Sequence, residues 1–260
     1  TIMYHNILWN YYSAKYNFSR LCVTAGVRED FEEPVETVLT KAFGRLSAID
    51  SRRWIRFLLD ILPELDDIDF DKLPMVEQRM LQMFYITVWG KSAPSWDDEE
   101  VLDNLYALAD SPVMLAELQK LLQYKYDRID FIDAPVRLGF DCPLDLHCTY
   151  TRDQLLVAMD FMNPNSVREG VKWLPEKQID VLFVTLNKSD KDYSPTTMYN
   201  DYSINETLFH WQSQSTTTDT GSVGQRYINH RKRGSKVLLF VREFKNDVVG
   251  AAPYTFLGTV

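Results

Sequence analysis

The hydrophobic pattern divides the chain into a helical first part and a second part rich in strands. Before about residue 134, apolar residues recur at intervals of three and four, and Val35, Val38, Leu39 and Ala42 are one such helical stripe. After Pro135, short and nearly continuous apolar runs replace this spacing. We therefore predict an α+β protein, with an all-helical connector domain over 1–134 and a β-rich, barrel-like recognition domain over 135–260 that includes one or two short helices.

Several polar residues mark expected helix starts. Asp50 and Ser95 precede apolar stripes and are predicted N-caps, whereas Pro74 and Pro112 suit the first turn of a helix. The helix after Pro74 has apolar residues on more than one face, which predicts a central position. In chain order we predict helices over about residues 2–16, 34–49, 51–62, 74–88, 96–108 and 112–129, with a further helical segment that includes Leu21 and Val23 and ends at Gly26.

The second part carries strand patterns with long connections. Predicted strands cover about residues 144–150, 170–174, 179–186, 237–241 and 254–257, and the run IDVLFVTL indicates a strand buried on both faces. Thr151 and Gln154 have the spacing of a capping box at the start of a short helix. Short strands joined by long connections favour an open or closed barrel.

One stretch interrupts the buried strands with polar and aromatic residues. Residues 205–234, here called the polar segment, combine aromatic rings, amides, histidines, a Ser/Thr run and a basic cluster. Polar side chains on a rigid β scaffold are typical of a recognition surface. We predict a nucleic-acid interface made of His210, Trp211, Gln212, Gln214, Arg226, Tyr227, His230, Arg231, Lys232 and Arg233.

Each residue type in this set suits a different part of a nucleic acid. The four arginine and lysine residues are expected to hold phosphates, and the glutamines can read base edges bidentately together with His210 and Tyr227. Trp211 is expected to stack on bases or to support the site. Lys188, Lys191 and Tyr193 are candidates to extend the same face.

A plainer interpretation competes with this interface. The basic cluster would then be a turn between two strands, with Trp211 and Tyr227 packed in the core. His210 and His230 could act as acid–base groups near neutral pH, but no acid follows either at short spacing, so hydrogen bonding in a recognition surface is favoured.

Charge and composition add a second asymmetry. The net charge is −9, yet from Leu146 onward 13 basic residues face 12 acidic ones, so the excess of acid lies in the first part. Two domains with different tasks are expected. No apolar run approaches the ~20 residues of a membrane span, and three cysteines suit a reducing cytoplasm. The start without Met and the abrupt end are typical of a piece of a longer polypeptide.

No familiar catalytic motif occurs. The chain has no P-loop, glycine-rich dinucleotide turn, metalloprotease helix or nucleophile elbow, so we predict no catalytic residue, metal or bound cofactor. The alternative is a magnesium-dependent nuclease in which Asp219, Glu243 and Lys245 act at a strand end. Cys142, His147 and Cys148 fit no common zinc spacing, and packed thiols are expected there.

A family resemblance rests on six segments of the second part. REGVKWL, FVTLNKSDKDYSPTTMYNDYSI, ETLFHWQSQSTT, GQRYINH, VLLFVRE and PYTFLGT, in this order, resemble a domain of unknown function at the C-terminus of bacterial DEAD/DEAH-box (superfamily II) helicases, which often carry a phospholipase-D-like nuclease. The segments EQRMLQMFYITVW and YDRID match more loosely the region that joins the helicase core to that domain.

The resemblance implies a DNA-binding, helicase-associated part that works in restriction-type phage defence. It implies DNA, modified or single-stranded, and the helicase core of the same polypeptide as partners, with ATP and magnesium bound only in that upstream core. It supplies no catalytic residue for this chain. A third hypothesis is a pure interaction domain, in which the acidic helical half docks a basic partner or the helicase core.

Overall fold

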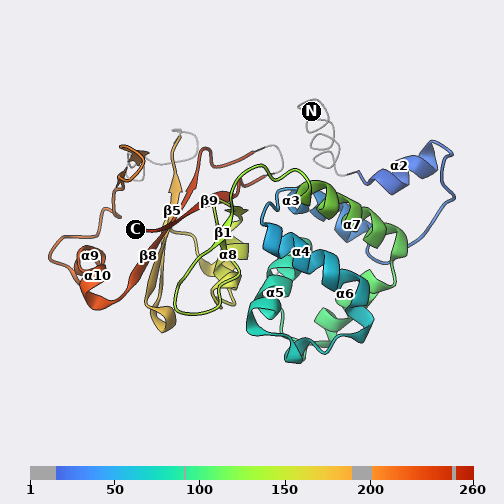
Figure 1. Cartoon of the computed structure of the whole chain (residues 1–260), viewed down its shortest axis with the longest axis horizontal. Helices are drawn as coiled ribbons and strands as arrows, with labels where there is room; N and C mark the ends of the chain where they lie inside the picture. Colours follow the sequence, from blue (N-terminus) through green and yellow to red (C-terminus); the bar gives the residue numbers. More distant parts are fainter. Residues whose placement is uncertain (1–15, 91, 189–200, 248–249) are drawn as a thin grey trace. The chain divides into compact units, whose positions relative to one another are not determined.

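The computed structural model describes residues 16–90, 92–188, 201–247 and 250–260 (Figure 1). These residues form an α+β protein with helices first and a mixed sheet later, which confirms the predicted fold class. The chain divides into two compact units, residues 1–166 and 167–260, whereas the change of sequence pattern falls at 134–135. The helix predicted over 2–16 falls outside the described residues apart from Tyr16.

The first unit consists mainly of helices. Its elements are α2 (Phe18–Thr24), α3 (Glu36–Leu46), α4 (Arg52–Ile61), η1 (Leu62–Asp67), η2 (Phe70–Lys72), α5 (Met75–Trp89), α6 (Glu99–Ala109), α7 (Pro112–Tyr126), β1 (Ala134–Pro135), β2 (Asp145–Leu146), β3 (Thr149–Tyr150), α8 (Arg152–Ala158) and η3 (Pro164–Ser166). No helix among the described residues has the length and apolar character needed to cross a membrane.

Helix α5 is the centre of the first unit, as its two-faced apolar pattern predicts. Residues 79–88 of α5 are all buried. The Trp54 indole N–H donates to the Met80 carbonyl at 3.0 Å, and the Gln154 amide donates to Thr87 Oγ1 at 2.8 Å. The same Gln154 completes the capping box with Thr151, which confirms that motif.

Two of the predicted helix caps are wrong. Ser51 caps α4, because its hydroxyl accepts the Trp54 N–H, while the Asp50 carboxylate accepts hydrogen bonds from Thr149 instead. Asp98, not Ser95, caps α6. In each case a neighbouring residue with equal capping ability takes the position, and spacing alone does not separate such candidates.

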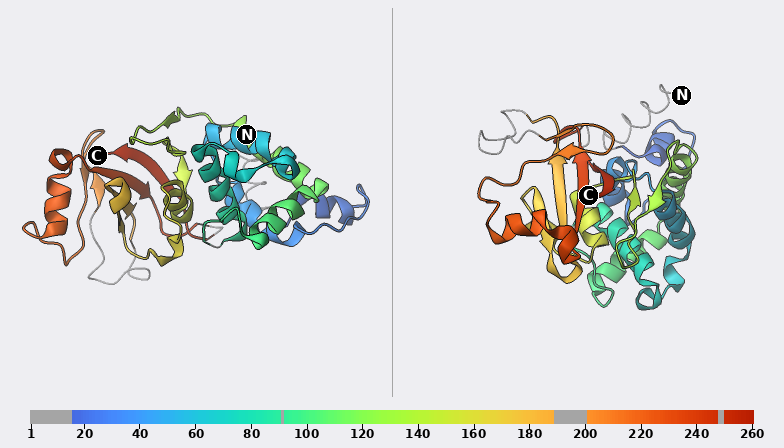
Figure 2. Two further views of the ribbon diagram at one scale, coloured as in Figure 1. Left: turned by 90° about the horizontal axis from the view of Figure 1, so that it is seen from below. Right: turned by 60° about the vertical axis from the view of Figure 1, so that its left-hand side comes forward.

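The second unit is built on a mixed sheet (Figure 2). Its elements are β4 (Val171–Leu174), η4 (Pro175–Lys177), β5 (Ile179–Thr185), β6 (Tyr202–Ser203), β7 (Phe209–His210), α9 (Ser222–Ile228), α10 (His230–Arg233), β8 (Lys236–Arg242) and β9 (Tyr254–Thr259). The sheet strands of this unit follow the order β9-β8-β5-β4. The β4–β5 and β8–β9 pairs are antiparallel, and β5 runs parallel to β8.

The parallel pair corrects the expectation of a barrel. Parallel neighbours need a long crossover connection, and the polar segment supplies part of it. The strands that the structure describes form an open mixed sheet and no closed barrel. The basic cluster is also no simple turn, because it occupies α9 and α10, which lie together beside the start of β8 (Figure 1).

The sheet is apolar on both faces. Every residue of β5 is buried, in agreement with its unbroken apolar run. One face carries a valine and leucine cluster against which Phe209, Trp211 and Tyr227 pack. The other face carries stacked aromatic rings, including Phe240 and Phe256 with centroids 4.5 Å apart. The connection through the polar segment is therefore fastened to the first of these faces.

Candidate nucleic-acid interface

Arg226 is tied to the sheet by an ion pair. Its guanidinium donates to both oxygens of Asp180 at 2.8 and 2.9 Å, and Asp180 is fully buried on β5. The guanidinium also lies 4.3 Å from the ring centroid of Trp173. Burial raises the pKa of Asp180, against the opposing effect of Arg226. The phosphate role of Arg226 stays a prediction, and in the structure its charge already has an internal partner.

Trp211 and Tyr227 form the inner layer of the polar segment. Their rings meet edge to face with centroids 5.3 Å apart, and both pack against the apolar cluster of the sheet. The Tyr227 hydroxyl donates to Gln214 Oε1 at 3.5 Å. These positions match the core interpretation of the two aromatics, so Trp211 is placed to support a site more than to stack on a base.

The β6–β7 hairpin holds His210. Strand register places His210 opposite Tyr202, and their rings stack with centroids 4.8 Å apart and an interplanar angle of 15°. Tyr202 is 51% exposed and His210 is partly exposed. The two rings together offer a flat, partly solvated surface, and Tyr202 was not among the residues predicted from the sequence.

A buried ion pair anchors this hairpin. Lys188 Nζ lies 2.6 Å from Asp201 Oδ2, and the exposed fractions of the two side chains are 8% and 4%. The other carboxylate oxygen of Asp201 accepts the Gln212 N–H at 2.9 Å. Lys188, predicted to extend a binding face, is therefore buried against Asp201. Lys191 and Tyr193 lie outside the described residues.

Helix α10 presents its positive charge to solvent. Arg231, Lys232 and Arg233 are exposed, and no partner of these side chains occurs among the described residues. Gly234 ends the helix in the left-handed conformation, at φ 71°. The His230 ring holds the start of α10 on α9, because its Nδ1 lies 2.7 Å from the Tyr227 carbonyl oxygen.

Gly224 shows how tightly the polar segment is packed. A Cβ at this position would lie 2.0 Å from the Thr218 carbonyl oxygen, so only glycine allows the Ser/Thr-rich stretch to lie against α9. The segment from β7 to α10 is therefore fixed by the Trp211–Tyr227 contact and by the close approach at Gly224.

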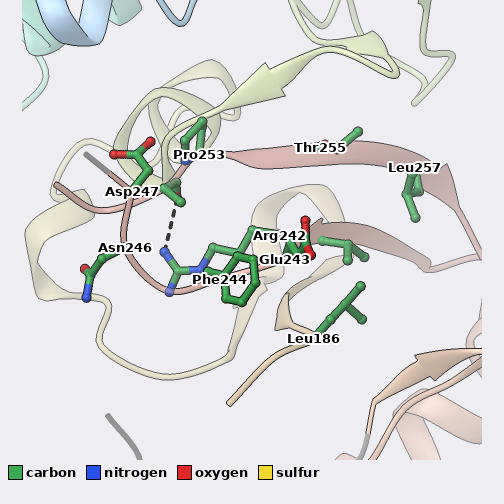
Figure 3. Close-up of a pocket in the computed structure, with 11 residues that line it drawn as sticks. Leu186, Arg242, Glu243, Phe244, Asn246, Asp247, Pro253, Thr255 and Leu257 are labelled. Atoms are coloured by element: carbon green, nitrogen blue, oxygen red, sulfur yellow. Dashed lines mark hydrogen bonds between the residues drawn. The ribbon is translucent and has the colours of Figure 1, made fainter. Parts of the chain in front are cut away.

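The Glu243–Lys245 stretch follows the carboxyl end of β8. Glu243 lines a shallow hollow of about 400 Å³ together with Phe244, Asn246 and Asp247 (Figure 3). Arg242 spans this region and donates to the Ala252 carbonyl at 3.1 Å. Neither Asp219 nor Lys245 is among the lining residues, so the structure does not bring the three predicted nuclease residues together in this hollow.

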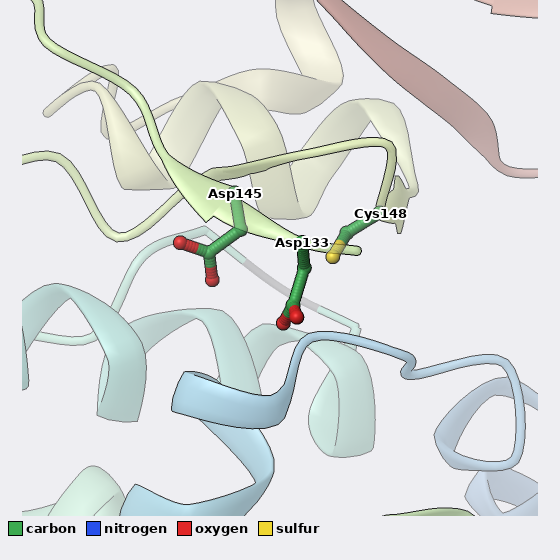
Figure 4. Close-up of side chains that lie close together, drawn as sticks. All are labelled: Asp133, Asp145 and Cys148. Atoms are coloured by element: carbon green, nitrogen blue, oxygen red, sulfur yellow. The ribbon is translucent and has the colours of Figure 1, made fainter. Parts of the chain in front are cut away.

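A separate acidic cluster lies in the first unit. Ligand atoms of Asp133, Asp145 and Cys148 lie within 4.8 Å of one another (Figure 4). Arg52 forms an ion pair with Asp133, and Arg53 forms one with Asp145 at 2.8 Å. Burial and the neighbouring carboxylates raise the pKa of Cys148, which keeps the thiol protonated.

This cluster is best explained as a structural charge network. A metal ion at this position would need the thiolate and would compete with two arginines that already neutralise the carboxylates. Of the three residues considered for zinc spacing, Cys148 belongs to the cluster, whereas Cys142 and His147 do not. Cys142 is buried, and burial raises its pKa to about 11.

Several residues of the candidate interface were not identified from the sequence. Asp180 has a detectable signal, because a single acid inside an otherwise apolar strand must find a buried partner. Asp201, Tyr202, Ile204 and Leu208 carry no such signal. Their roles depend on the β6–β7 pairing, which covers two residues on each strand and has no clear alternation.

A similarity to a known protein family is found in the later part of the chain. No curated protein and no solved structure matches this chain significantly. Residues 144–260 match the model of one family, described as a domain of unknown function (DUF3427). This match includes the whole second unit and confirms the similarity to a domain of unknown function that the six sequence segments indicate.

Proposed function

We propose that the second unit binds DNA. In this proposal the chain is the non-catalytic C-terminal part of a superfamily II helicase or helicase–nuclease and recognises or positions DNA for that motor in restriction-type phage defence. The helicase context comes from the resemblance of the six sequence segments. The binding role comes from the placement of charge and rings in the polar segment.

The observation that carries the proposal is the exposed charge of α10. Arg231, Lys232 and Arg233 are consecutive and solvent-exposed, and they have no acidic partner among the described residues. Three adjacent exposed cations create a positive local potential, and this potential attracts an anionic ligand. Phosphates are the anions that three adjacent cations on a short helix suit best.

The neighbouring side chains supply groups for the bases. Tyr202 and His210 offer a stacked pair of rings at the hairpin, and Gln212 and Gln214 follow directly. Aromatic rings stack on unpaired bases, and glutamine amides read base edges through two hydrogen bonds. Trp211 and Tyr227 connect this group to α9, so bases and phosphates would meet one fixed assembly.

Fluorescence anisotropy with labelled oligonucleotides tests the proposal. The panel contains duplexes and single strands of DNA and RNA, plain and base-modified, at several salt concentrations. We expect binding whose logarithm falls linearly with the logarithm of salt concentration, with a preference for one DNA member. Absence of binding to every member at low salt would reject the proposal.

A magnesium-dependent nuclease is the second candidate function. It is favoured by one observation, the position of Glu243 in a hollow at the carboxyl end of a strand that has a parallel neighbour. Asp247 lines the same hollow and is the acid that would join Glu243 there. Cleavage assays with and without magnesium separate this candidate from pure binding.

A further inference from the structure

We propose that the β6–β7 hairpin is an apolar wedge that unstacks a base step of duplex DNA. The inference rests on the proposed DNA binding and adds what the second unit does to its ligand. The wedge residues are Ile204 and Leu208, which lie on the turn side of the Tyr202–His210 pair.

The first observation is that large apolar side chains of the hairpin are exposed to solvent. Tyr202, Ile204 and Leu208 are 51, 55 and 56% exposed, and all three fall within seven residues. Large apolar side chains that gather in one exposed place, rather than singly, mark a binding surface. Here the exposed group belongs to a short hairpin with a buried ion pair at its base.

The tip of the hairpin is braced from within. The Asn205 side-chain oxygen accepts hydrogen bonds from the N–H groups of Thr207 and Leu208, both at 2.9 Å. The Leu208 carbonyl in turn accepts the N–H groups of Ile204 and Asn205. These bonds fix the backbone of the turn that carries the two exposed apolar side chains.

The base of the hairpin is also fixed. The buried Lys188–Asp201 pair holds its first strand, and the Asp201–Gln212 bond joins the segments that enter and leave the hairpin. Trp211, directly after β7, is packed on the sheet. A wedge must resist the restoring force of base stacking, and a hairpin anchored at both strands meets that requirement.

Charge favours DNA as the occupant over an apolar protein surface. The chain runs from the hairpin through the Trp211–Tyr227 contact to His230 and the three exposed cations of α10. Proteins that insert apolar wedges between base steps also use arginine, lysine and amide side chains to contact the groove. Glu206, at the tip, is the group that opposes this approach, so its removal should strengthen binding.

The test uses the full chain and duplexes that carry 2-aminopurine, whose fluorescence rises on unstacking. The variant is Ile204→Ser/Leu208→Ser. The matched control is Val27→Ser/Ile132→Ser, which removes side chains that are 75 and 81% exposed in the first unit. For the parent and the control we expect a several-fold fluorescence rise on binding and about tenfold tighter binding to a mismatched duplex, because its step is already weakened.

For the wedge variant we expect the rise and the mismatch preference to disappear while α10 still binds phosphate. Glu206→Gln should tighten duplex binding about threefold through reduced repulsion. An undiminished fluorescence rise in the wedge variant would overturn the wedge and leave DNA binding intact. No anisotropy change with any duplex would overturn the wedge, and the same result with single strands as well would overturn the proposed function itself. Self-association lost only in the wedge variant would then identify a protein contact.

Discussion

Two groups of arginines in this molecule use their charge in opposite ways. In the first unit, Arg53 and Arg79 form ion pairs with acids at 2.8 and 2.6 Å, and the Arg79 side chain is 8% exposed. On α10 of the second unit, Arg231 and Arg233 are exposed and have no acidic partner among the described residues. The first group joins elements of the fold, whereas the second remains available to a ligand.

The difference shows that a basic cluster in the sequence has no single meaning. Arg226 belongs to the same cluster as Arg231, yet it resembles the first group, because it is paired with a fully buried acid. Charges taken out of water need a partner, and exposed charges keep their hydration at little cost. Stability and DNA affinity should therefore depend on different members of one cluster.

The largest effect is expected from Arg226→Ala. This change leaves the Asp180 carboxylate buried and unpaired, and we expect the free energy of unfolding of the second unit to fall by about 3–5 kcal/mol. Chemical denaturation followed by fluorescence measures it. Arg231→Ala is the matched control and should change that free energy by less than about 0.5 kcal/mol.

A double variant shows whether the pair itself is needed. Replacing both partners, in Asp180→Leu/Arg226→Met, removes the unpaired charge and should recover most of the lost stability. Equal destabilisation by Arg226→Ala and Arg231→Ala would contradict the distinction between the two members of the cluster.

A half-buried acid without an arginine partner is expected to make stability depend on pH. Burial raises the pKa of Asp50 to about 6, although hydrogen bonds from Thr149 and the charge of Lys125 oppose the shift. Between pH of about 4 and 6 the folded chain thus holds a proton that the unfolded chain has lost. The protonated Asp50 therefore adds to the free energy of unfolding, on the order of 3 kcal/mol. This stabilisation is complete below the unfolded pKa and is lost as pH rises through about 6.

Denaturation at pH 4.5, 5.5 and 6.5 measures this slope. Asp50→Asn removes the titrating group, so the difference in unfolding free energy between parent and variant should change with pH across this window. Parallel profiles for the two proteins would show that another group dominates. Asp130→Asn, which removes an exposed carboxyl on the loop after α7, is the matched control for the loss of one acid.

The helical unit is the part that the sequence predicts best. A helix satisfies its backbone within one segment, so the spacing of apolar residues is enough to find it, as in α5. The Thr151–Gln154 box is equally local and was predicted correctly. The caps at Asp50 and Ser95 were not, because each has an equally suitable neighbour and long-range contacts decide between them.

The second unit is less predictable because its strands depend on partners far away in the chain. The apolar run of β5 predicts a buried strand but not its parallel pairing with β8, and that pairing replaces the expected barrel with an open sheet. The sequence also indicated where the polar segment lies, but it did not distinguish the roles of the individual residues in that segment. Arg226 and Arg231 look alike in the chain, and only the position of Asp180 distinguishes them.

A moderate effect on DNA binding is expected from Arg231→Ala/Lys232→Ala. Loss of two phosphate contacts should weaken binding about tenfold and reduce the slope of log affinity against log salt by about 2. Anisotropy titrations at several salt concentrations measure both. Arg28→Ala/Lys120→Ala removes two exposed cations of the first unit and should change neither. A salt slope unchanged in the α10 variant would separate α10 from the phosphates.

The smallest effect on stability is expected from Glu243→Gln. This variant extends the comparison of paired and exposed charges from arginines to acidic residues. Glu243 is exposed in the hollow after β8, so its charge is hydrated and its removal should change the unfolding free energy by less than about 0.5 kcal/mol. Glu176→Gln, at another exposed acid, is the control. Because neither Asp219 nor Lys245 lines the hollow, we also expect magnesium to produce no cleavage that depends on Glu243. Magnesium-dependent cleavage by the parent and the Glu176→Gln control, but not by Glu243→Gln, would instead make this exposed acid catalytic and favour the nuclease function.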